Sequence, residues 1–134
     1  MLSAIPLMIV PFIIYNAIMI GIAGTGIEGL SAPLLELEMM SGALWTMSLG
    51  NLLIVIGLVM MFFEILKATR TGSWSVMDHL LSTFLFVAFI VEFLLVEKAA
   101  TDVFFILMVI AFVDVIAGFS VSIRSAGRDV SIGL

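Results

Sequence analysis

The residue whose setting most invites chemistry is an aspartate inside an almost unbroken apolar run. Asp114 lies near the middle of residues 105–123, FILMVIAFVDVIAGFSVSI. If this run is a helix, Asp114 is about 18 Å from Asp102 and about 15 Å from Arg124 along its axis, too far for a direct ion pair. An aspartate at mid-depth in a bilayer costs about 2.5–3.5 kcal/mol on insertion scales. We therefore expect Asp114 to be protonated or to meet a cation.

Three roles for Asp114 are open at this point. As a protonated residue, it would set the register of neighbouring helices through a hydrogen bond. It would otherwise belong to a path for protons or cations, because ionisable groups inside a membrane commonly mark such paths. In the third role it would contact a basic group supplied by another subunit.

Uncharged polar residues fall near the same depth in other apolar runs. Asn16 and Asn51 each lie roughly 12 Å inside the outer boundary expected for their runs, and Tyr15 adjoins Asn16. Asp114 lies about one helical turn deeper. We predict one intramembrane polar layer of Tyr15, Asn16, Asn51 and Asp114. Interhelical polar contacts in membranes average about 0.6 kcal/mol, so such a layer would mainly fix helix register.

Three further ionisable residues lie in or near the apolar runs. Glu92 is roughly 7 Å below the outer surface, where it either extends an ion path with Asp114 or, as we favour, reaches interfacial water. Glu64 lies three residues before Lys67, a spacing that predicts a local ion pair. His79, the single histidine, is predicted to be a polar cap at the membrane interface.

The residue types argue against catalysis and against a bound cofactor. The chain has no cysteine, which excludes thiolate metal sites and thiol nucleophiles within it. We find no nucleophile–base pair, no phosphate-binding loop and no set of metal ligands in the sequence. The net charge of −5 counts against nucleic acid as a partner, because no basic patch is available to neutralise phosphates. We predict a protein that is not an enzyme and holds neither metal nor cofactor.

The elements that position these residues are predicted from composition. Of the 134 residues, 63% are hydrophobic and only 11% are charged, whereas soluble domains are near half apolar and a quarter charged. Because lipid offers no hydrogen-bond partner to free backbone groups, the apolar runs are expected to be helices. The sequence therefore predicts an all-α integral membrane protein with the lipid bilayer around it.

Four apolar runs are each near the length of about 20 residues that a helical span needs. They cover about 4–24, 43–66, 77–96 and 102–123. Short connections predict an antiparallel bundle of four helices in a single domain, 1–134. Ser75 and Thr101 are the predicted N-caps of the third and fourth helices. Residues 33–40 either extend the second helix or form a separate interfacial helix.

The distribution of charge predicts the orientation. Basic residues follow the second and fourth runs: Lys67, Arg70, Arg124 and Arg128. The charged residues of the connection after the first run are all acidic: Glu28, Glu36 and Glu38. By the positive-inside rule both termini face the cytoplasm, and Trp45 and Trp74 fall near opposite interfaces. Size and charge bias favour a bacterial inner membrane.

Small residues mark the faces on which the helices are expected to pack, because they let backbones approach closely in lipid. On the second run they recur every seven residues in line with Glu64, and on the fourth they share a face with Asp114. The predicted packing residues are Ala17, Gly21, Gly24, Ala43, Gly50, Gly57, Ala111, Ala117 and Gly118.

Three functions are compatible with these features. The favoured one is a small accessory or structural subunit that packs against other membrane subunits or against copies of itself, because the small-residue faces exceed what one four-helix bundle requires. The alternative is a small oligomeric transporter or channel for protons or cations that uses Asp114. A membrane-perturbing protein such as a holin is the third.

Overall fold

A computed structural model describes the backbone of residues 5–22, 24, 26–70 and 73–133. The protein is mostly helical, at 73%. In chain order the elements are α1 (Ile9–Met19), the 3-10 helix η2 (Gly26–Ser31), β1 (Pro33–Glu38), β2 (Leu44–Ser48), α2 (Leu49–Lys67), α3 (Ser73–Leu95), the 3-10 helix η3 (Glu97–Ala99) and α4 (Asp102–Gly133).

Three helices are long and apolar enough to cross a membrane: α2 over Leu49–Lys67, α3 over Ser75–Leu95 and α4 over Asp102–Arg124. The fourth, α1, has 11 residues, or about 16 Å at 1.5 Å per residue. It is shorter than the predicted run 4–24, so the structure supports three spans and leaves the first as a prediction.

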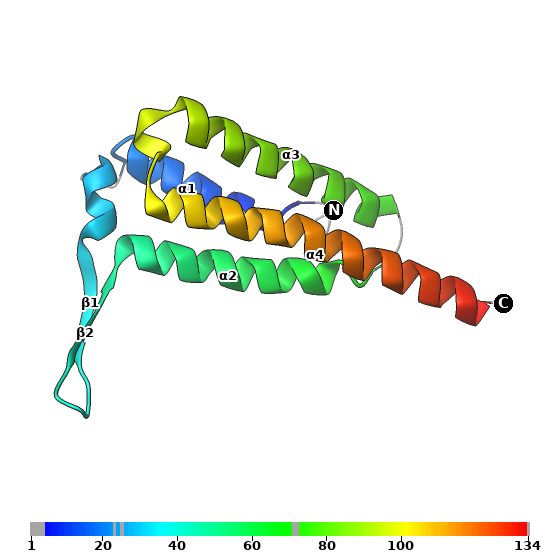
Figure 1. Cartoon of the computed structure of the whole chain (residues 1–134), viewed down its shortest axis with the longest axis horizontal. Coiled ribbons are helices and arrows are strands. Elements are labelled where there is room, and N and C mark those ends of the chain that lie inside the picture. Colours follow the sequence, from blue (N-terminus) through cyan, green and yellow to red (C-terminus); the bar gives the residue numbers. More distant parts are fainter. Residues whose placement is uncertain (1–4, 23, 25, 71–72, 134) are drawn as a thin grey trace.

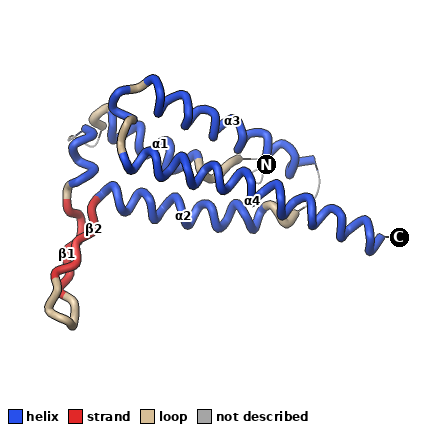
Figure 2. Tube along the Cα trace, viewed as in Figure 1, coloured by secondary structure: helices blue, strands red, loops and turns tan. Residues whose placement is uncertain are grey.

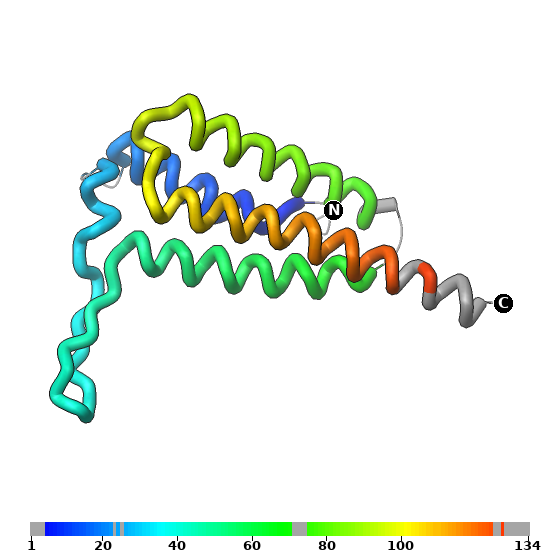
Figure 3. The backbone as a smooth tube through the Cα atoms, in the orientation of Figure 1, coloured from blue at the N-terminus to red at the C-terminus, as the bar shows by residue number. Residues whose placement is uncertain are grey.

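The helices alternate in direction along the bundle (Figure 1). α1 and α3 run toward the end from which the β1–β2 hairpin projects, and α2 and α4 run away from it. We call these the hairpin end and the opposite end. α4 continues past the other helices at the opposite end (Figure 1), because its helix extends beyond Arg124 to Gly133. The backbone tube follows the same alternation of helix directions (Figure 3).

The two small-residue stripes predicted on the second and fourth runs pack against each other. A Cβ at Gly50 would lie 2.7 Å from Cγ2 of Val103, and one at Gly57 would lie 2.9 Å from Cδ2 of Leu107. The missing side chains therefore let the parallel helices α2 and α4 approach. Ala43 does not belong to this stripe, because it lies in the exposed turn before β2.

The segment before α2 differs from the prediction made from the sequence. Residues 33–40 neither extend the second helix nor form an interfacial one. Pro33–Glu38 and Leu44–Ser48 pair as an antiparallel hairpin (Figure 2), which the alternation of leucine and glutamate in LELE favours over a helix. α2 consequently begins at Leu49, where the Ser48 side chain caps it by accepting a hydrogen bond from the Asn51 backbone N–H.

The stripe predicted on the first run is also wrong beyond Ala17. α1 ends at Met19, and Gly21 and Gly24 follow with φ of +87° and +92°. That left-handed conformation suits glycine and breaks the helix. The two glycines therefore form the turn after α1 and share no helical face with Ala17.

The predicted N-caps have opposite outcomes. Thr101 is confirmed as the cap of α4, since its Oγ1 accepts a hydrogen bond from the Phe104 backbone N–H at 3.2 Å. Ser75 is not the cap of α3, because that helix already begins at Ser73. Its hydroxyl instead lies 3.4 Å from that of Ser122 on α4. Trp45 lies in β2, whereas the side chain of Trp74 is outside the described part.

Aromatic side chains form the centre of the bundle. Phe104 of α4 lies with its ring centroid 4.8 Å from that of Tyr15 and 5.2 Å from that of Phe89. Phe12 of α1 meets Phe89 edge-on at 4.8 Å. Tyr15, Phe89 and Phe104 are completely buried, so α1, α3 and α4 are joined by one dry aromatic layer.

Candidate functional site

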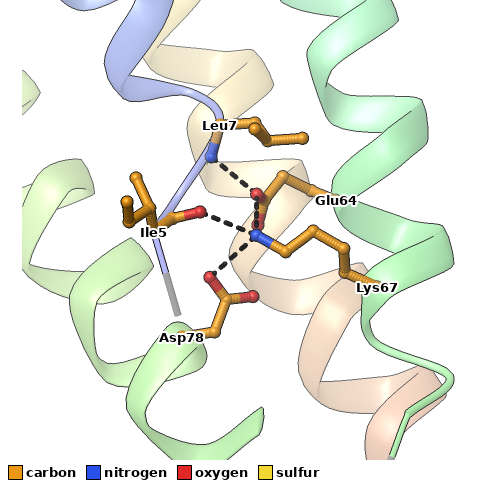
Figure 4. A network of polar contacts seen from close by, with 5 residues as sticks. All are labelled: Ile5, Leu7, Glu64, Lys67 and Asp78. Carbon is orange, nitrogen blue, oxygen red and sulfur yellow. Dashed lines mark hydrogen bonds and ion pairs between the residues drawn. The ribbon is translucent and has the colours of Figure 1, made fainter. Parts of the chain in front are cut away.

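Buried charges gather at the opposite end, where α1 begins, α2 ends and α3 starts. The ammonium of Lys67 donates to the carbonyl oxygen of Ile5 at 2.7 Å, to Oε1 of Glu64 at 3.0 Å and to Oδ1 of Asp78 at 3.2 Å (Figure 4). The Leu7 backbone N–H donates to the same Glu64 oxygen at 2.6 Å. These contacts hold the start of α1 against α2 and α3.

The sequence predicted one part of this arrangement and missed the other. The (i, i+3) pair of Glu64 and Lys67 is confirmed. The contact of Lys67 with Asp78 was missed, because the two residues are eleven positions apart and on different helices. A usable signal was present: the two residues flank the short connection between the second and third runs, which brings the end of one helix beside the start of the next.

Asp114 faces this group from α4. Gly57 of α2 packs beside Leu107 and Ile110, and Ala68, directly after α2, lies beside Gly118. Glu64 and Asp114 each lie between those two levels, so they face each other in the contact of α2 with α4. Both are only 4% exposed. We call Glu64, Lys67, Asp78 and Asp114 the charged cluster.

Lys67 has no donor left for Asp114. An ammonium carries three N–H groups, and those of Lys67 go to Ile5, Glu64 and Asp78. Glu64, Asp78 and Lys67 are the charged groups that act on Asp114. Within the described ranges no hydrogen bond to the Asp114 carboxyl is found. The charged cluster therefore has three carboxyl groups and one ammonium.

Two polar side chains of α3, His79 and Ser82, are buried beside the cluster. His79 is 8% exposed, packs over Gly118 and lies 4.8 Å from the ring of Phe119 between centroids. This histidine thus packs against α4, and its predicted place at the membrane interface stays a prediction. Neither Nε2 of His79 nor Oγ of Ser82 has a hydrogen-bond partner among the residues described.

A second group of polar residues lies near the hairpin end. Tyr15 donates its hydroxyl to the carbonyl oxygen of Lys98 at 3.0 Å and shares a 2.7 Å hydrogen bond with Oγ1 of Thr101. Asn16 donates from Nδ2 to the Phe12 carbonyl oxygen at 2.9 Å and to Oε2 of Glu92 at 3.2 Å. We call Tyr15, Asn16, Glu92 and Thr101 the tyrosine cluster. It joins α1 to α3 and to the start of α4.

The predicted polar layer is therefore split. Tyr15 and Asn16 belong to the tyrosine cluster, while Asn51 is exposed and lines a shallow groove with Thr101 and Asp102. Asp114 is thirteen residues beyond Thr101 on the same helix, which is about 20 Å. The structure does not bring Asp114 together with the other three.

The split has a simple physical cause. The predicted depths were counted from runs that ended at residue 24 and began at residue 43. Because α1 ends at Met19 and α2 begins at Leu49, Asn16 and Asn51 both lie within about one turn of a helix end. Glu92 joins Asn16 rather than Asp114, and Phe89 and Phe104 of the aromatic layer lie between the tyrosine cluster and the charged cluster.

The remaining predicted packing residues are all on the inner side of α4. Ala111 and Gly118 are buried beside Asp114, and Ala117 is half-buried.

Among the described residues, no group of three or more histidine, aspartate or glutamate side chains is arranged to hold a metal ion. The charged cluster can hold protons and ion pairs in a protected setting, and the tyrosine cluster can fix the position of α1.

Comparison of the chain with protein-family models, with curated proteins and with solved structures gave no match.

Proposed function

We propose that the chain is a non-enzymatic integral membrane protein that acts as an accessory subunit by packing against other membrane subunits. Its four α-helices form an antiparallel bundle with both termini on the cytoplasmic side of a bacterial inner membrane. Three apolar helices of spanning length support the membrane setting. The apolar sequence of the short first helix and its packing against α2 and the aromatic layer support a position inside the bilayer.

Charge supports the orientation. Lys67 ends α2 and Arg70 follows it at the opposite end, and Arg124 and Arg128 lie on the last part of α4. The hairpin end carries the acids Glu28, Glu36 and Glu38 and the exposed Lys98. The opposite end therefore faces the cytoplasm under the positive-inside rule.

The observation that carries the accessory role is a groove on the outer side of α1. It has a volume of about 420 Å³ and is lined by Phe12, Ile13, Asn16, Ala17, Ile20 and Ile22. The small side chain of Ala17 would let a second helix approach closely, as alanine and glycine do at membrane helix contacts. Ile13 and Ile20 are 56% and 69% exposed, so the chain itself does not cover this groove.

Asn16 and Glu92, a polar pair at the groove, indicate which chemical groups the partner helix carries. Asn16 lines the groove and donates to Glu92, and both residues are half-buried. Glu92 keeps acceptor capacity beyond this one hydrogen bond. A transmembrane helix with a small or apolar face and one hydrogen-bond donor at the level of Asn16 would satisfy the groove.

The small-residue stripes on α2 and α4 do not support the accessory role by themselves. Gly50, Gly57 and Gly118 all pack against other helices of the same chain. The surplus of such faces expected from the sequence is therefore absent on α2 and α4, and the argument for a partner rests on α1.

Filling the groove tests the proposal. Ala17→Phe should remove partner subunits that co-purify with the wild-type protein from native membranes in mild detergent. Val87→Phe is the matched control, because Val87 is an exposed α3 residue outside the groove. Wild-type protein that purifies without any stoichiometric partner, or a partner retained equally by both variants, would contradict the accessory role.

Proton or cation transport is the second candidate, and the charged cluster favours it. Every donor of Lys67 is used, and no other cation among the described side chains pairs with Asp114. Asp114 therefore suits a site that takes up a proton. The aromatic layer lies between Asp114 and Glu92, so transport along both would require α1, α3 and α4 to move apart. Asp114→Asn in reconstituted vesicles should abolish flux with assembly intact if this candidate holds.

A further inference from the structure

The β1–β2 hairpin has two chemically different faces. Its register pairs Leu35 with Met47 and Leu37 with Trp45. Cross-strand partners share a face of a two-stranded sheet, so these four side chains form one continuous surface, which we call the apolar face.

The other face of the hairpin carries both glutamates together with Thr46 and the exposed Leu44, and we call it the acidic face. The register pairs Glu36 with Thr46 and Glu38 with Leu44, and side chains alternate along a strand. Both glutamates therefore point away from the apolar face. At the tip, the Met39 N–H donates to the Ala43 carbonyl oxygen, and the N–H of Gly42, which has a φ of +88°, donates to the Met39 carbonyl oxygen. These contacts close the turn.

The apolar face is left open by the rest of the chain. The hairpin projects from the end of the bundle and runs crosswise to the helices (Figures 1 and 2). Leu35, Leu37 and Trp45 are 45%, 46% and 40% exposed. An isolated two-stranded hairpin is marginally stable in water at best, so this element needs a second surface.

We propose that this surface is the lipid bilayer: the hairpin lies flat in the membrane interface, with its apolar face toward the hydrocarbon and its acidic face toward water. The hairpin is continuous with a membrane boundary, because Ser48 is both the last residue of β2 and the N-cap of α2. No linker separates the sheet from the first residue of a spanning helix.

The direction and composition of the hairpin fit an interfacial element. Running crosswise to the helices places it parallel to the membrane plane rather than out into solvent. Tryptophan is enriched at the level of the headgroups, where Trp45 would lie. An amphipathic segment binds an interface through its buried apolar area, and the two glutamates keep the opposite face in water.

The absence of native cysteine allows a direct test. Leu37→Cys and Glu36→Cys place a spin label on the apolar face and on the acidic face at adjacent positions. In full-length protein reconstituted at high dilution into phosphatidylcholine vesicles, the label at 37 should be relaxed strongly by oxygen, which concentrates in lipid. The label at 36 should be relaxed mainly by a water-soluble nickel chelate, so the oxygen-to-nickel accessibility ratio should differ several-fold.

Native tryptophan gives a second readout that leaves the hairpin unaltered. In Trp74→Phe, emission from Trp45 should be quenched by phosphatidylcholine brominated near the headgroup more than by lipid brominated near the chain end. Equal nickel accessibility at 36 and 37, or unquenched Trp45 emission, would overturn the proposal. Lipid protection that disappears on dilution of the protein would also overturn it, in favour of contact between copies. Protection that needs an added membrane fraction would overturn it in favour of a partner protein.

Discussion

The ammonium of Lys67, the last residue of α2, lies 3.2 Å from the carboxylate of Asp78 in the first turns of α3. The same ammonium reaches Glu64 and the carbonyl oxygen of Ile5. One positive charge thus joins three chain segments at one end of the bundle. The side chains of Glu64 and Asp78 are 3% and 4% exposed, so the pairing takes place largely out of water.

Removing that charge should destabilise the protein strongly. Lys67→Met leaves three buried carboxyl groups without a cation, and losing one partner of a buried ion pair costs about 3–5 kcal/mol. We expect a loss near the lower end, about 3 kcal/mol, because Lys67 itself is 15% exposed. The free energy of unfolding in detergent, followed by circular dichroism, measures it. Lys98→Met at the exposed hairpin end is the control, and an equal loss in both variants would refute the role of the cluster.

The glycines between α2 and α4 should not tolerate a side chain. In Gly50→Ala the new Cβ would lie 2.7 Å from Cγ2 of Val103 and 3.1 Å from the backbone oxygen of Leu30. A backbone oxygen cannot turn aside, so we expect a loss of about 1–3 kcal/mol from overpacking. Thermal unfolding of the purified protein would show it.

Gly127→Ala is the matched control for that substitution. Gly127 lies on α4, and a Cβ added to it would meet no other atom within 4 Å. Alanine favours helix over glycine by about 1 kcal/mol, so we expect this variant to be neutral or slightly stabilised. Equal destabilisation in Gly50→Ala and Gly127→Ala would show that close packing of α2 on α4 does not cause the loss of stability.

Features carried by local pattern were predictable from the sequence. The apolar lengths of α2, α3 and α4 require no tertiary information, and Thr101 followed by Asp102 is a local cap signal. The small-residue stripes on α2 and α4 were also visible, as was their alignment with Glu64 and Asp114. Their contact with each other was not, because a stripe does not identify the surface that covers it.

The depths predicted for Asn16 and Asn51 were wrong for a different reason. Span ends were taken from hydropathy, which counted β2 as part of the second run and the residues after Met19 as part of the first. A few residues of error at each end move a side chain by several ångströms along the axis. That was enough to place Asn16 and Asn51 with Asp114, although the structure sets them at helix ends.

The tyrosine cluster yields a prediction about how α1 is held. Tyr15 has a single hydroxyl hydrogen, which it donates to the Lys98 carbonyl oxygen. Thr101 is therefore the donor in the hydrogen bond between the two hydroxyl groups. Tyr15→Phe should cost about 1 kcal/mol in unfolding free energy, since the ring stays and only hydrogen bonds are lost.

A double-mutant cycle separates that contact from the cap of α4. Thr101→Ala removes both the contact with Tyr15 and the hydrogen bond to the Phe104 backbone N–H. The double variant should be less destabilised than the sum of the single ones by at least about 0.5 kcal/mol, as for residues in one network. Full additivity would mean that the two hydroxyl groups do not interact.

Asp114 and Glu64 should respond in opposite ways to neutral replacement, although they face each other and are equally buried. Glu64 accepts from Lys67 and from the Leu7 backbone N–H, so Glu64→Gln weakens two charge-assisted hydrogen bonds, each worth about 1.5–3 kcal/mol. Asp114→Asn gives up no contact to a cation and removes a carboxyl group that lies among other carboxyl groups. We expect Asp114→Asn to leave stability unchanged or raised, and Glu64→Gln to lower it by about 2 kcal/mol. Unfolding of both variants at one neutral pH measures the difference. A large loss in Asp114→Asn would show that a cation, rather than a proton, accompanies this residue in the folded protein.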